Sequence, residues 1–278
     1  MGVVEAIVLG IVQAITEFLP ISSDGHLILV PSLLGWERFG LGFDVVLHAG
    51  TLLATVVYFR ADVVDLAKGL FSRGPERALS RRLAWILIGA TVPSVAVVLA
   101  LEPFVTGVEN RPVQEQIAIS AWGLLVTTAV LATSELIAWR ERRRSAPIDD
   151  ANAISLRKAL IIGFAQGFAA LPGVSRSGST IATAQALGVT RGEAARFSFL
   201  MSIPIIGAAT AKKSLDIITG EGSLPGVTVT VVGVTVTTIV GYGVIHFLLP
   251  FVRRHSLGWF AAYTAIAGIL LLAFYGPL

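Results

Sequence analysis

Long runs without a charged side chain limit what this chain can fold into more than any other feature. Four runs contain no Asp, Glu, Lys or Arg, namely residues 83–101, 116–134, 222–252 and 256–278. At a rise of ~1.5 Å per residue, a helix over any of these runs can cross a hydrocarbon layer of ~30 Å. Because 54% of the residues are hydrophobic and only 14% are charged, the sequence predicts an all-α polytopic membrane protein.

Local pattern and composition narrow this class further. Residues 226–241 alternate valine and threonine as a strand would, but lipid does not accept a lone unpaired strand, so we predict a helix there. The chain has no cysteine, which excludes disulfides, thiolate catalysis and cysteine-based metal sites. The net charge of +3 is small and its basic residues gather in a few loops, which indicates membrane topology and no nucleic-acid partner.

Two pairs of apolar segments are too short to cross a membrane. The first pair covers residues 6–16 and 25–36, and the second covers residues 159–175 and 177–190. A helix of about 12 residues covers only about 18 Å. Each pair is interrupted by a turn rich in Pro, Gly and Ser, and such a turn is tolerated at membrane depth only where protein or water surrounds it. We therefore predict two re-entrant helical hairpins.

The two hairpins look like copies of one another. A shift of 153 residues aligns Gly10 with Gly163, Gln13 with Gln166, Ile21 with Val174, Ser22 with Ser175 and Gly25 with Gly178. The alternative is a chance recurrence of Gly, Ser and Ala, which are common in membrane helices. The shared order of hairpin, short crosser and two long crossers favours a duplication. Three crossings per copy is an odd number, so the second copy inserts upside down relative to the first.

The predicted fold is thus an inverted-topology internal repeat, each copy with a re-entrant helical hairpin plus three transmembrane helices. The first repeat covers residues 1–139, with hairpin 2–35 and crossers at about 43–59, 83–101 and 116–138; a basic cytoplasmic linker covers 140–158; the second repeat covers 159–278, with hairpin 159–190 and crossers at about 195–211, 226–249 and 257–276.

Loop charge predicts the orientation, because cytoplasmic loops carry an excess of Lys and Arg. Loops 60–82, 140–158 and 253–254 are basic, whereas loop 102–116 holds three Glu against one Arg. Both termini then lie outside the plasma membrane, the first hairpin enters from outside and the second from the cytoplasm. Lys212 and Lys213, at the outer end of a crosser, run against this rule.

Charged and hydroxyl side chains gather in the two hairpin turns, where an ionisable residue is costly and indicates function. The first turn, "TEFLPISSDGHL" at 16–27, carries Glu17, and the second, "LPGVSRSGST" at 171–180, carries Arg176, so we predict that these two residues pair. Arg176 beside a Gly-rich turn that opens a helix suits a phosphate, because the guanidinium and the free N–H groups both bind anions. The predicted phosphate ligands are Ser22, Ser175, Arg176, Ser177 and Thr180. The alternative is that the hydroxyls only pack helices and that Arg176 extends to a lipid headgroup.

His26 is the acid–base candidate, because it follows Ser23 by three residues and lies near Glu17. Three attacking groups are open: Ser23 with His26 as its base, His26 itself, or water activated by Glu17. We favour the first. The other histidines, interpreted as incidental or structural, are His48, His246 and His255.

Both turns resemble the signature motifs of a known family. "QAITEFLPISSDGH" at 13–26 and "LPGVSRSGST" at 171–180 are similar to the two motifs of the undecaprenyl-diphosphatase (bacitracin-resistance) family of integral membrane proteins. The resemblance implies hydrolysis of undecaprenyl diphosphate to the monophosphate and inorganic phosphate, at the outer face of the membrane. It also implies dependence on a divalent cation, Mg²⁺ or Ca²⁺.

The resemblance assigns roles to positions. It implies that Glu17, Ser23, His26 and Arg176 are catalytic, with Ser22 as a further hydroxyl. Gln13 takes the first acidic position of the motif, so a carboxylate pair is missing, and the implied metal ligands are Glu17 and Gln13. Asp24 either compensates for that loss or is an ordinary turn residue.

The expected partners are a polyprenyl diphosphate lipid and the bilayer; a homodimer is compatible with the sequence, which does not decide the oligomeric state. A polyprenyl-phosphate transporter or flippase is the rival function, because inverted repeats with a charged site at the midplane are typical of alternating access. The clustering of Glu17, Ser23 and His26 on one turn favours an enzyme. The phosphatidic-acid-phosphatase type is set aside, because it needs a His shortly after its Ser-Arg element and "SRSGSTIATAQALG" contains none.

Overall fold

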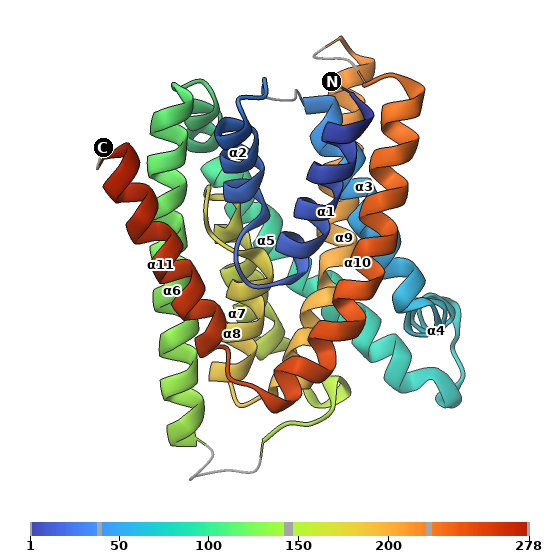
Figure 1. Cartoon of the computed structure of the whole chain (residues 1–278). Coiled ribbons are helices and arrows are strands. Elements are labelled where there is room, and N and C mark those ends of the chain that lie inside the picture. The colour runs from blue at the N-terminus through green and yellow to red at the C-terminus, as the bar shows by residue number, and fades with distance from the viewer. Residues whose placement is uncertain (1, 38–40, 142–146, 221–223, 277–278) are drawn as a thin grey trace.

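The computed structural model describes residues 2–37, 41–141, 147–220 and 224–276 as a bundle of helices (Figure 1). Residues 142–146 of the predicted basic linker lie outside the described residues. The helices are α1 (Val3–Phe18), α2 (Ser23–Leu34), α3 (Leu41–Tyr58), α4 (Arg60–Phe71), α5 (Ala78–Glu109), α6 (Val113–Glu141), α7 (Leu156–Gly167), α8 (Arg176–Ala186), α9 (Arg191–Ile218), α10 (Val227–Arg254) and α11 (Gly258–Tyr275), with single 3₁₀ turns at Pro75–Arg77, Ala151–Ala153 and Phe168–Ala170. In the described part of the chain, β structure is limited to one isolated bridge between Ile148 and Val189. The prediction of helix for the Val/Thr run is confirmed by α10.

Five helices, α5, α6, α9, α10 and α11, are long and apolar enough to cross a membrane. The bent pair of α3 and α4 raises the number to six if it counts as one span. Large apolar side chains such as Val92, Ile239 and Phe274 lie exposed on the outside of these helices, as they would in contact with lipid tails. The protein is therefore a multi-pass membrane protein with an all-helical fold.

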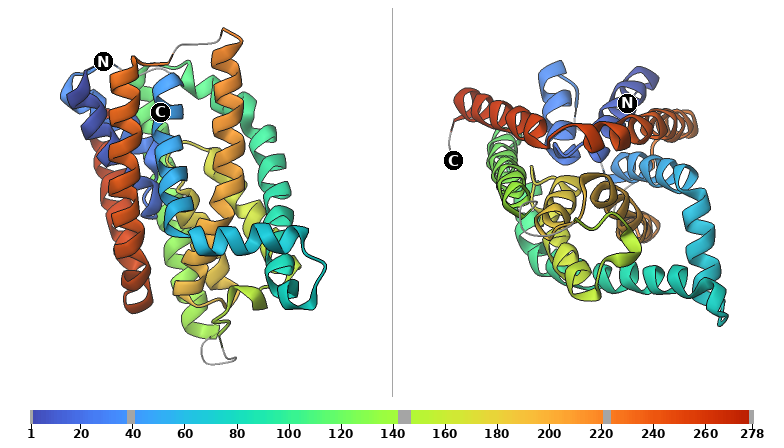
Figure 2. Two further views of the ribbon diagram at one scale, coloured as in Figure 1. Left: turned by 90° about the vertical axis from the view of Figure 1, so that its right-hand side faces the viewer. Right: turned by 90° about the horizontal axis from the view of Figure 1, so that it is seen from below.

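Helix α4 corrects one expectation. We expected residues 60–82 to form a basic loop, but a second helix begins at Arg60 and turns away from α3 by 82°. Figure 2 shows α4 lying across the long helices. The charged residues of α4 form contacts within the protein. Asp62 accepts a hydrogen bond from Arg196 of α9 at 2.5 Å, and Asp65 pairs with Arg77 at 3.4 Å. Charge density alone does not distinguish such a helix from a loop.

Two pairs of short helices, α1 with α2 and α7 with α8, bring their turns together inside the bundle (Figure 1). The hydroxyl of Ser177 donates to the carbonyl of Leu19 at 3.1 Å, so the two turns touch directly. Gly173 has φ +82, and a Cβ at this position would lie 1.9 Å from the carbonyl oxygen of Ser120 on α6. Only glycine permits both this conformation and this close approach.

The long helices pack around these turns in matching pairs. Helix α1 packs on α10 and α7 packs on α5; α3 packs on α10 and α9 packs on α5; α3 also packs on α9, and α6 on α11. Suppose that α1 is exchanged with α7, α3 with α9, α5 with α10 and α6 with α11. The contact of α1 with α10 then becomes the contact of α7 with α5, and the contact of α3 with α10 becomes that of α9 with α5. The contacts of α3 with α9 and of α6 with α11 remain the same.

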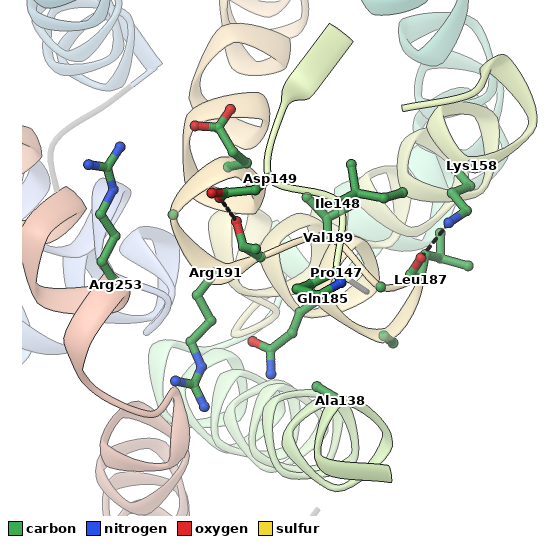
Figure 3. A pocket seen from close by; sticks show the side chains of 15 residues that line it. Ala138, Pro147, Ile148, Asp149, Lys158, Gln185, Leu187, Val189, Arg191 and Arg253 are labelled. Atoms are coloured by element: carbon green, nitrogen blue, oxygen red, sulfur yellow. Dashed lines mark hydrogen bonds between the residues drawn. The ribbon is translucent and has the colours of Figure 1, made fainter. Parts of the chain in front are cut away.

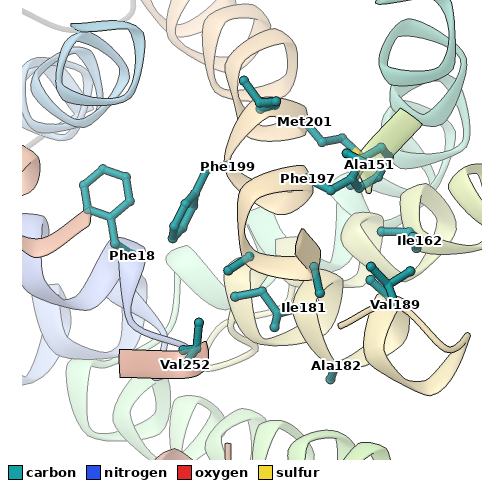
Figure 4. Close-up of a cluster of buried hydrophobic side chains, with 14 of the residues drawn as sticks. Phe18, Ala151, Ile162, Ile181, Ala182, Val189, Phe197, Phe199, Met201 and Val252 are labelled. Atoms are coloured by element: carbon teal, nitrogen blue, oxygen red, sulfur yellow. The ribbon is translucent and has the colours of Figure 1, made fainter. Parts of the chain in front are cut away.

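A large cluster of buried apolar side chains holds the second hairpin and the end of the first (Figure 4). Phe18, the last residue of α1, is fully buried and meets Phe199 of α9 edge to face at 5.6 Å between ring centroids. Ile181 of α8 and Met201 of α9 are also fully buried in this cluster. Between membrane helices such packing is stabilised by van der Waals contact, so these closely packed side chains fix the position of the turns.

Candidate functional site

A buried ion pair joins the two hairpins. Arg176, at the start of α8, donates from Nη2 to Glu17 Oε1 at 2.8 Å, across 159 positions of sequence. The side chains of Arg176 and Glu17 are only 13% and 7% exposed. A buried charge is stable only with a partner, so each residue fixes the position of the other. The structure thus brings together the two charges that the sequence pairs.

Glu17 is engaged by two further donors. Ser23, the first residue of α2, donates its hydroxyl proton to Glu17 Oε2 at 2.6 Å. Gln13, one turn earlier on α1, donates from Nε2 to the same oxygen at 3.4 Å. The carboxylate therefore orients the hydroxyl of Ser23 and the guanidinium of Arg176 at once.

Buried polar atoms without partners surround this pair. Within the described residues, Arg176 Nε and Nη1, Gln13 Oε1 and Ser22 Oγ are buried and lack a hydrogen-bond partner. Leaving a buried polar group unpaired costs ~1–3 kcal/mol, and more for a charged one, so these atoms are available to bind a polar ligand or water. Each of these guanidinium N–H groups can donate to a phosphate oxygen.

The start of α8 adds to this anion site. Ser175 caps the helix, because its Oγ accepts from the backbone N–H of Gly178 at 3.0 Å. The backbone N–H of Ser175 itself donates to Thr127 Oγ1 on α6 at 3.0 Å. The first turn of a helix leaves N–H groups that no helix carbonyl accepts, and its dipole favours negative charge.

A cavity of about 620 Å³ opens beside the ion pair. Among the residues proposed from sequence, Glu17, Ser23, Ser175 and Arg176 line it. Its apolar wall comes from α5 and α9 and includes Val95, Val98, Leu99, Ile205 and Ile206. The cavity thus combines an anion-binding end with an apolar wall.

Other predicted residues point elsewhere. His26 is not part of the cavity wall; its Nδ1 donates to the carbonyl of Ser22 at 2.6 Å, and its Nε2 lies 2.7 Å from the hydroxyl of Tyr263 on α11. Ser23 therefore pairs with Glu17 and not with His26. The hydroxyls of Ser177 and Thr180 are also engaged within the protein, by Leu19 and by Ser198 and others.

Ser22 holds a strained conformation at the first turn. Its φ of 72° makes it the one non-glycine residue in the left-handed region among the described residues. The residue is also buried, at 3% exposure. Such strain costs ~1–3 kcal/mol and persists only where the surroundings enforce it, which is typical of functional sites.

Several polar residues of the cavity wall were not predicted from the sequence, three of them on α3 and α7. Asp44 and His48, from one turn of α3, and Gln166 of α7 line the cavity with Glu17 and Arg176. The sequence analysis interprets His48 as incidental. Two signals were present: an imidazole within an apolar crosser, and the alignment of Gln166 with Gln13 in the repeat.

A second cavity of about 710 Å³ lies at the other end of α8 (Figure 3). Its polar contacts are internal: Lys158 Nζ donates to the carbonyl of Leu187 at 2.7 Å, and Thr190 Oγ1 donates to Asp149 at 2.8 Å. Arg191 binds Glu135 of α6 through two hydrogen bonds of 3.0 and 2.6 Å. None of the predicted site residues lines this cavity.

The oxygen atoms at the first cavity suit a hard cation only in part. In the described ranges, no group of three His, Cys, Asp or Glu side chains is placed to hold a metal ion. Glu17 offers one carboxylate, and Gln13 Oε1 is a buried oxygen without a partner. Mg²⁺ is commonly held by one or two carboxylates together with substrate phosphates and waters. Glu17 and Gln13 could therefore supply part of the coordination shell of such a cation, and the oxygens of a bound phosphate could supply the rest.

Comparison with known proteins identifies the family. Residues 6–270 match the family described as bacitracin resistance protein BacA. The relatives include Undecaprenyl-diphosphatase 2 of Stutzerimonas stutzeri, 39% identical over 99% of both chains. The undecaprenyl-diphosphatases of Trichlorobacter lovleyi and Methanosphaera stadtmanae are 41% and 38% identical, each over at least 98% of both chains. The prediction made from the two motifs is confirmed: this chain belongs to the bacitracin resistance protein BacA family.

Proposed function

We infer that this protein is a hydrolase that converts undecaprenyl diphosphate to undecaprenyl phosphate and inorganic phosphate, and so recycles the lipid carrier for cell-wall synthesis. The full-length relatives named undecaprenyl-diphosphatase support this function. The observation in the structure that carries it is the pair of buried, unpartnered N–H groups on Arg176 beside a cavity with an apolar wall. A diphosphate on a prenyl chain has the matching chemistry.

The terminal phosphate binds at Arg176 and the first turn of α8. An unpartnered N–H of Arg176, on Nε or on Nη1, binds its oxygens, while Nη2 stays on Glu17. Donors that are already in place stabilise the negative charge that develops as phosphoryl transfer proceeds, because they need no reorganisation at that moment. The prenyl chain follows the apolar wall of α5 and α9.

Ser23 is the attacking group in this proposal. Its hydroxyl donates to Glu17 at 2.6 Å, and both line the cavity with Arg176. Fixing the hydroxyl beside the bound phosphate turns the attack into a reaction between neighbours. This geometry favours Ser23 over His26, whose two ring nitrogens are engaged by Ser22 and Tyr263.

A divalent cation, Mg²⁺ or Ca²⁺, belongs to the same proposal, with Glu17 and Gln13 as its protein ligands. Such an ion neutralises phosphate charge during transfer. The unpartnered Gln13 Oε1 and the carboxylate of Glu17 support the assignment.

The proposed membrane arrangement is an inverted repeat with two re-entrant hairpins and a site that faces outward from the plasma membrane. The matching helix pairs, α1 on α10 with α7 on α5, and α3 on α10 with α9 on α5, support the repeat. The C-terminal ends of α6 and α10 carry Arg140, Arg253 and Arg254 and lie at the end of the bundle away from the N-terminus (Figure 1). Basic helix ends on that side support a cytoplasmic assignment for it.

Phosphate release from undecaprenyl diphosphate by the purified protein tests this function. We expect release that a chelator abolishes, and a loss of about 10²-fold or more in Arg176→Lys, because lysine keeps the charge but lacks the planar fork. Arg254→Lys, on the exposed end of α10, is the matched control and should match wild type. A folded wild type that releases no phosphate would refute the activity, and full activity in Arg176→Lys would refute the site.

A further inference from the structure

Helix α4 lies across the bundle and has no part in the candidate site. None of its residues lines either of the two cavities. It is bent by 82° from α3, so when α3 crosses a membrane α4 runs nearly parallel to the membrane surface. Figure 2 shows α4 at the edge of the bundle, between the ends of α3 and α5. A helix with this orientation and with two unlike faces is typical of the boundary between headgroups and hydrocarbon.

The inner face of α4 is held firmly by the fold. Val63 and Leu66 pack against the large cluster of buried apolar side chains. Gly69 lies so close to the start of α5 that a Cβ at this position would be 2.7 Å from the backbone nitrogen of Arg81. Because the inner face is fixed in this way, the packing also determines which side chains of α4 point outward.

An apolar stripe runs along the outward face. Val64 is 47% exposed and Phe71 is 90% exposed. Ala67, between them, is exposed as well. Residues three and four positions apart share one face of a helix, so these three side chains lie in line. A phenylalanine as exposed as Phe71 is stabilised when the acyl boundary of a membrane takes it up.

The acidic side chains of α4 are paired within the protein. Asp62 accepts from Arg196 of α9, and Asp65 pairs with Arg77. The third acid of this region, Glu76, accepts from the hydroxyl of Ser72 at 3.3 Å. These carboxylates are therefore held by other groups of the chain.

Two basic side chains next to the stripe are available to a partner. Lys68, on α4, and Arg73, just after it, are exposed and form no hydrogen bond or ion pair with other described residues. Residues 60–82 hold six basic side chains against three acidic ones. The surface around the stripe is therefore positively charged, and it is complementary to anionic headgroups.

We propose that the outward face of α4 binds anionic phospholipids at the membrane surface, through Val64, Ala67, Lys68, Phe71 and the adjoining Arg73. Val64 and Phe71 enter the apolar side of the boundary, and Lys68 and Arg73 contact the lipid phosphates. Long basic side chains reach headgroups in this way while their stems stay in apolar surroundings. This surface lies apart from both cavities, so its lipid binding does not depend on the proposed phosphatase activity.

Because the chain has no cysteine, a single label can test this surface. Ala67→Cys carries a fluorophore, and the protein is placed in phosphatidylcholine vesicles at low salt. Small amounts of phosphatidylglycerol or phosphatidylcholine are included, each with the same quencher near its headgroup. We expect phosphatidylglycerol to quench at least about fivefold more strongly, because each basic residue near an anionic surface favours binding by about that factor. In 1 M salt, where the Debye length is ~3 Å, the ratio should fall toward one.

Three variants locate the effect. Lys68→Gln combined with Arg73→Gln should bring the quenching ratio close to one, while thermal unfolding in detergent stays as in the parent protein. Arg254→Gln is the matched control, because it removes an exposed basic side chain at the end of α10, and it should keep the parent ratio. A label at Leu53→Cys, which is 45% exposed on α3, should report a ratio near one.

Each contrary result rules the lipid surface out. Equal quenching of the Ala67→Cys label by the two lipids would show that α4 does not select anionic headgroups. A high ratio that persists without Lys68 and Arg73 would assign the selection to another part of the chain. A label that neither lipid quenches would place this face in water or under a second protein chain, and would overturn the proposal as well.

Discussion

The two hairpin turns align with one another in the proposed internal repeat but differ in their backbone conformation. In the second turn, Gly173 takes the positive φ and Ser175 caps the helix through Gly178. In the first turn, Ser22 takes the positive φ without being glycine, and its hydroxyl has no partner among the described residues. The second turn therefore positions Arg176 without backbone strain, whereas the backbone of the first turn is strained at Ser22. Strain collects on the side that carries the attacking hydroxyl of Ser23.

Disrupting the packing of the second turn on α6 should have the largest effect on the stability of the fold. In Gly173→Ala, the new Cβ meets the carbonyl oxygen of Ser120 at 1.9 Å and the φ of +82° is strained as well. We expect the unfolding free energy to fall by ~4 kcal/mol or more. Thermal unfolding in detergent measures this, and Gly188→Ala is the control, because its φ is +90° but no atom lies within 4 Å of the new Cβ.

The Gly188→Ala control separates the cost of backbone strain from the cost of the steric clash with Ser120. Gly188→Ala should cost only ~1–2 kcal/mol, the price of a left-handed alanine. If both variants lost the same unfolding free energy, the close packing of the second turn on α6 would contribute nothing to stability. The contrast between an unstrained second turn and a strained first turn would then be unsupported.

Sequence reasoning found the hairpin pair because costly residues in short apolar segments leave a strong signal. Glu17 and Arg176 stand out in any hydropathy reading, and they lie 2.8 Å apart in the structure. The family and the all-helical membrane fold were likewise predicted from motifs and apolar runs, and they are confirmed.

What the sequence missed depends on contacts between distant segments. Tyr263 meets His26 across 237 positions, and no local pattern predicts this contact. His48 reaches the cavity only because α3 packs beside the hairpins. Helix α4 was missed because its charges are paired with α9 and with Arg77, while a one-dimensional reading takes charge as a sign of a loop.

The contact between Tyr263 and His26 supplies a test of the strained turn. Tyr263 donates to Nε2 at 2.7 Å, the two rings stack, and Nδ1 holds the carbonyl of Ser22. Removing the hydroxyl in Tyr263→Phe keeps the stacking but frees Nε2, so the turn is held less firmly. We expect kcat to fall about fivefold, the equivalent of one hydrogen bond of ~1 kcal/mol.

Tyr275→Phe, on the same helix, is the control for this measurement and should leave kcat unchanged. The comparison also separates positioning from direct chemistry, because a positioning role predicts that KM and the response to chelator stay as in wild type. If Tyr263→Phe were indistinguishable from wild type, His26 would hold the turn without help from α11.

The smallest effect, and the one that contrasts the turns most directly, comes from the aligned serines. Ser22→Gly removes the strained side chain, so the unfolding free energy should rise by ~1 kcal/mol even though turnover falls. Ser175→Ala removes a helix cap, so the unfolding free energy should fall by ~1 kcal/mol. Both values come from thermal unfolding of the purified variants. Opposite signs at two aligned positions would show that the first turn holds its shape for the reaction and the second for the fold, whereas a loss of stability in Ser22→Gly would mean that its backbone is not strained.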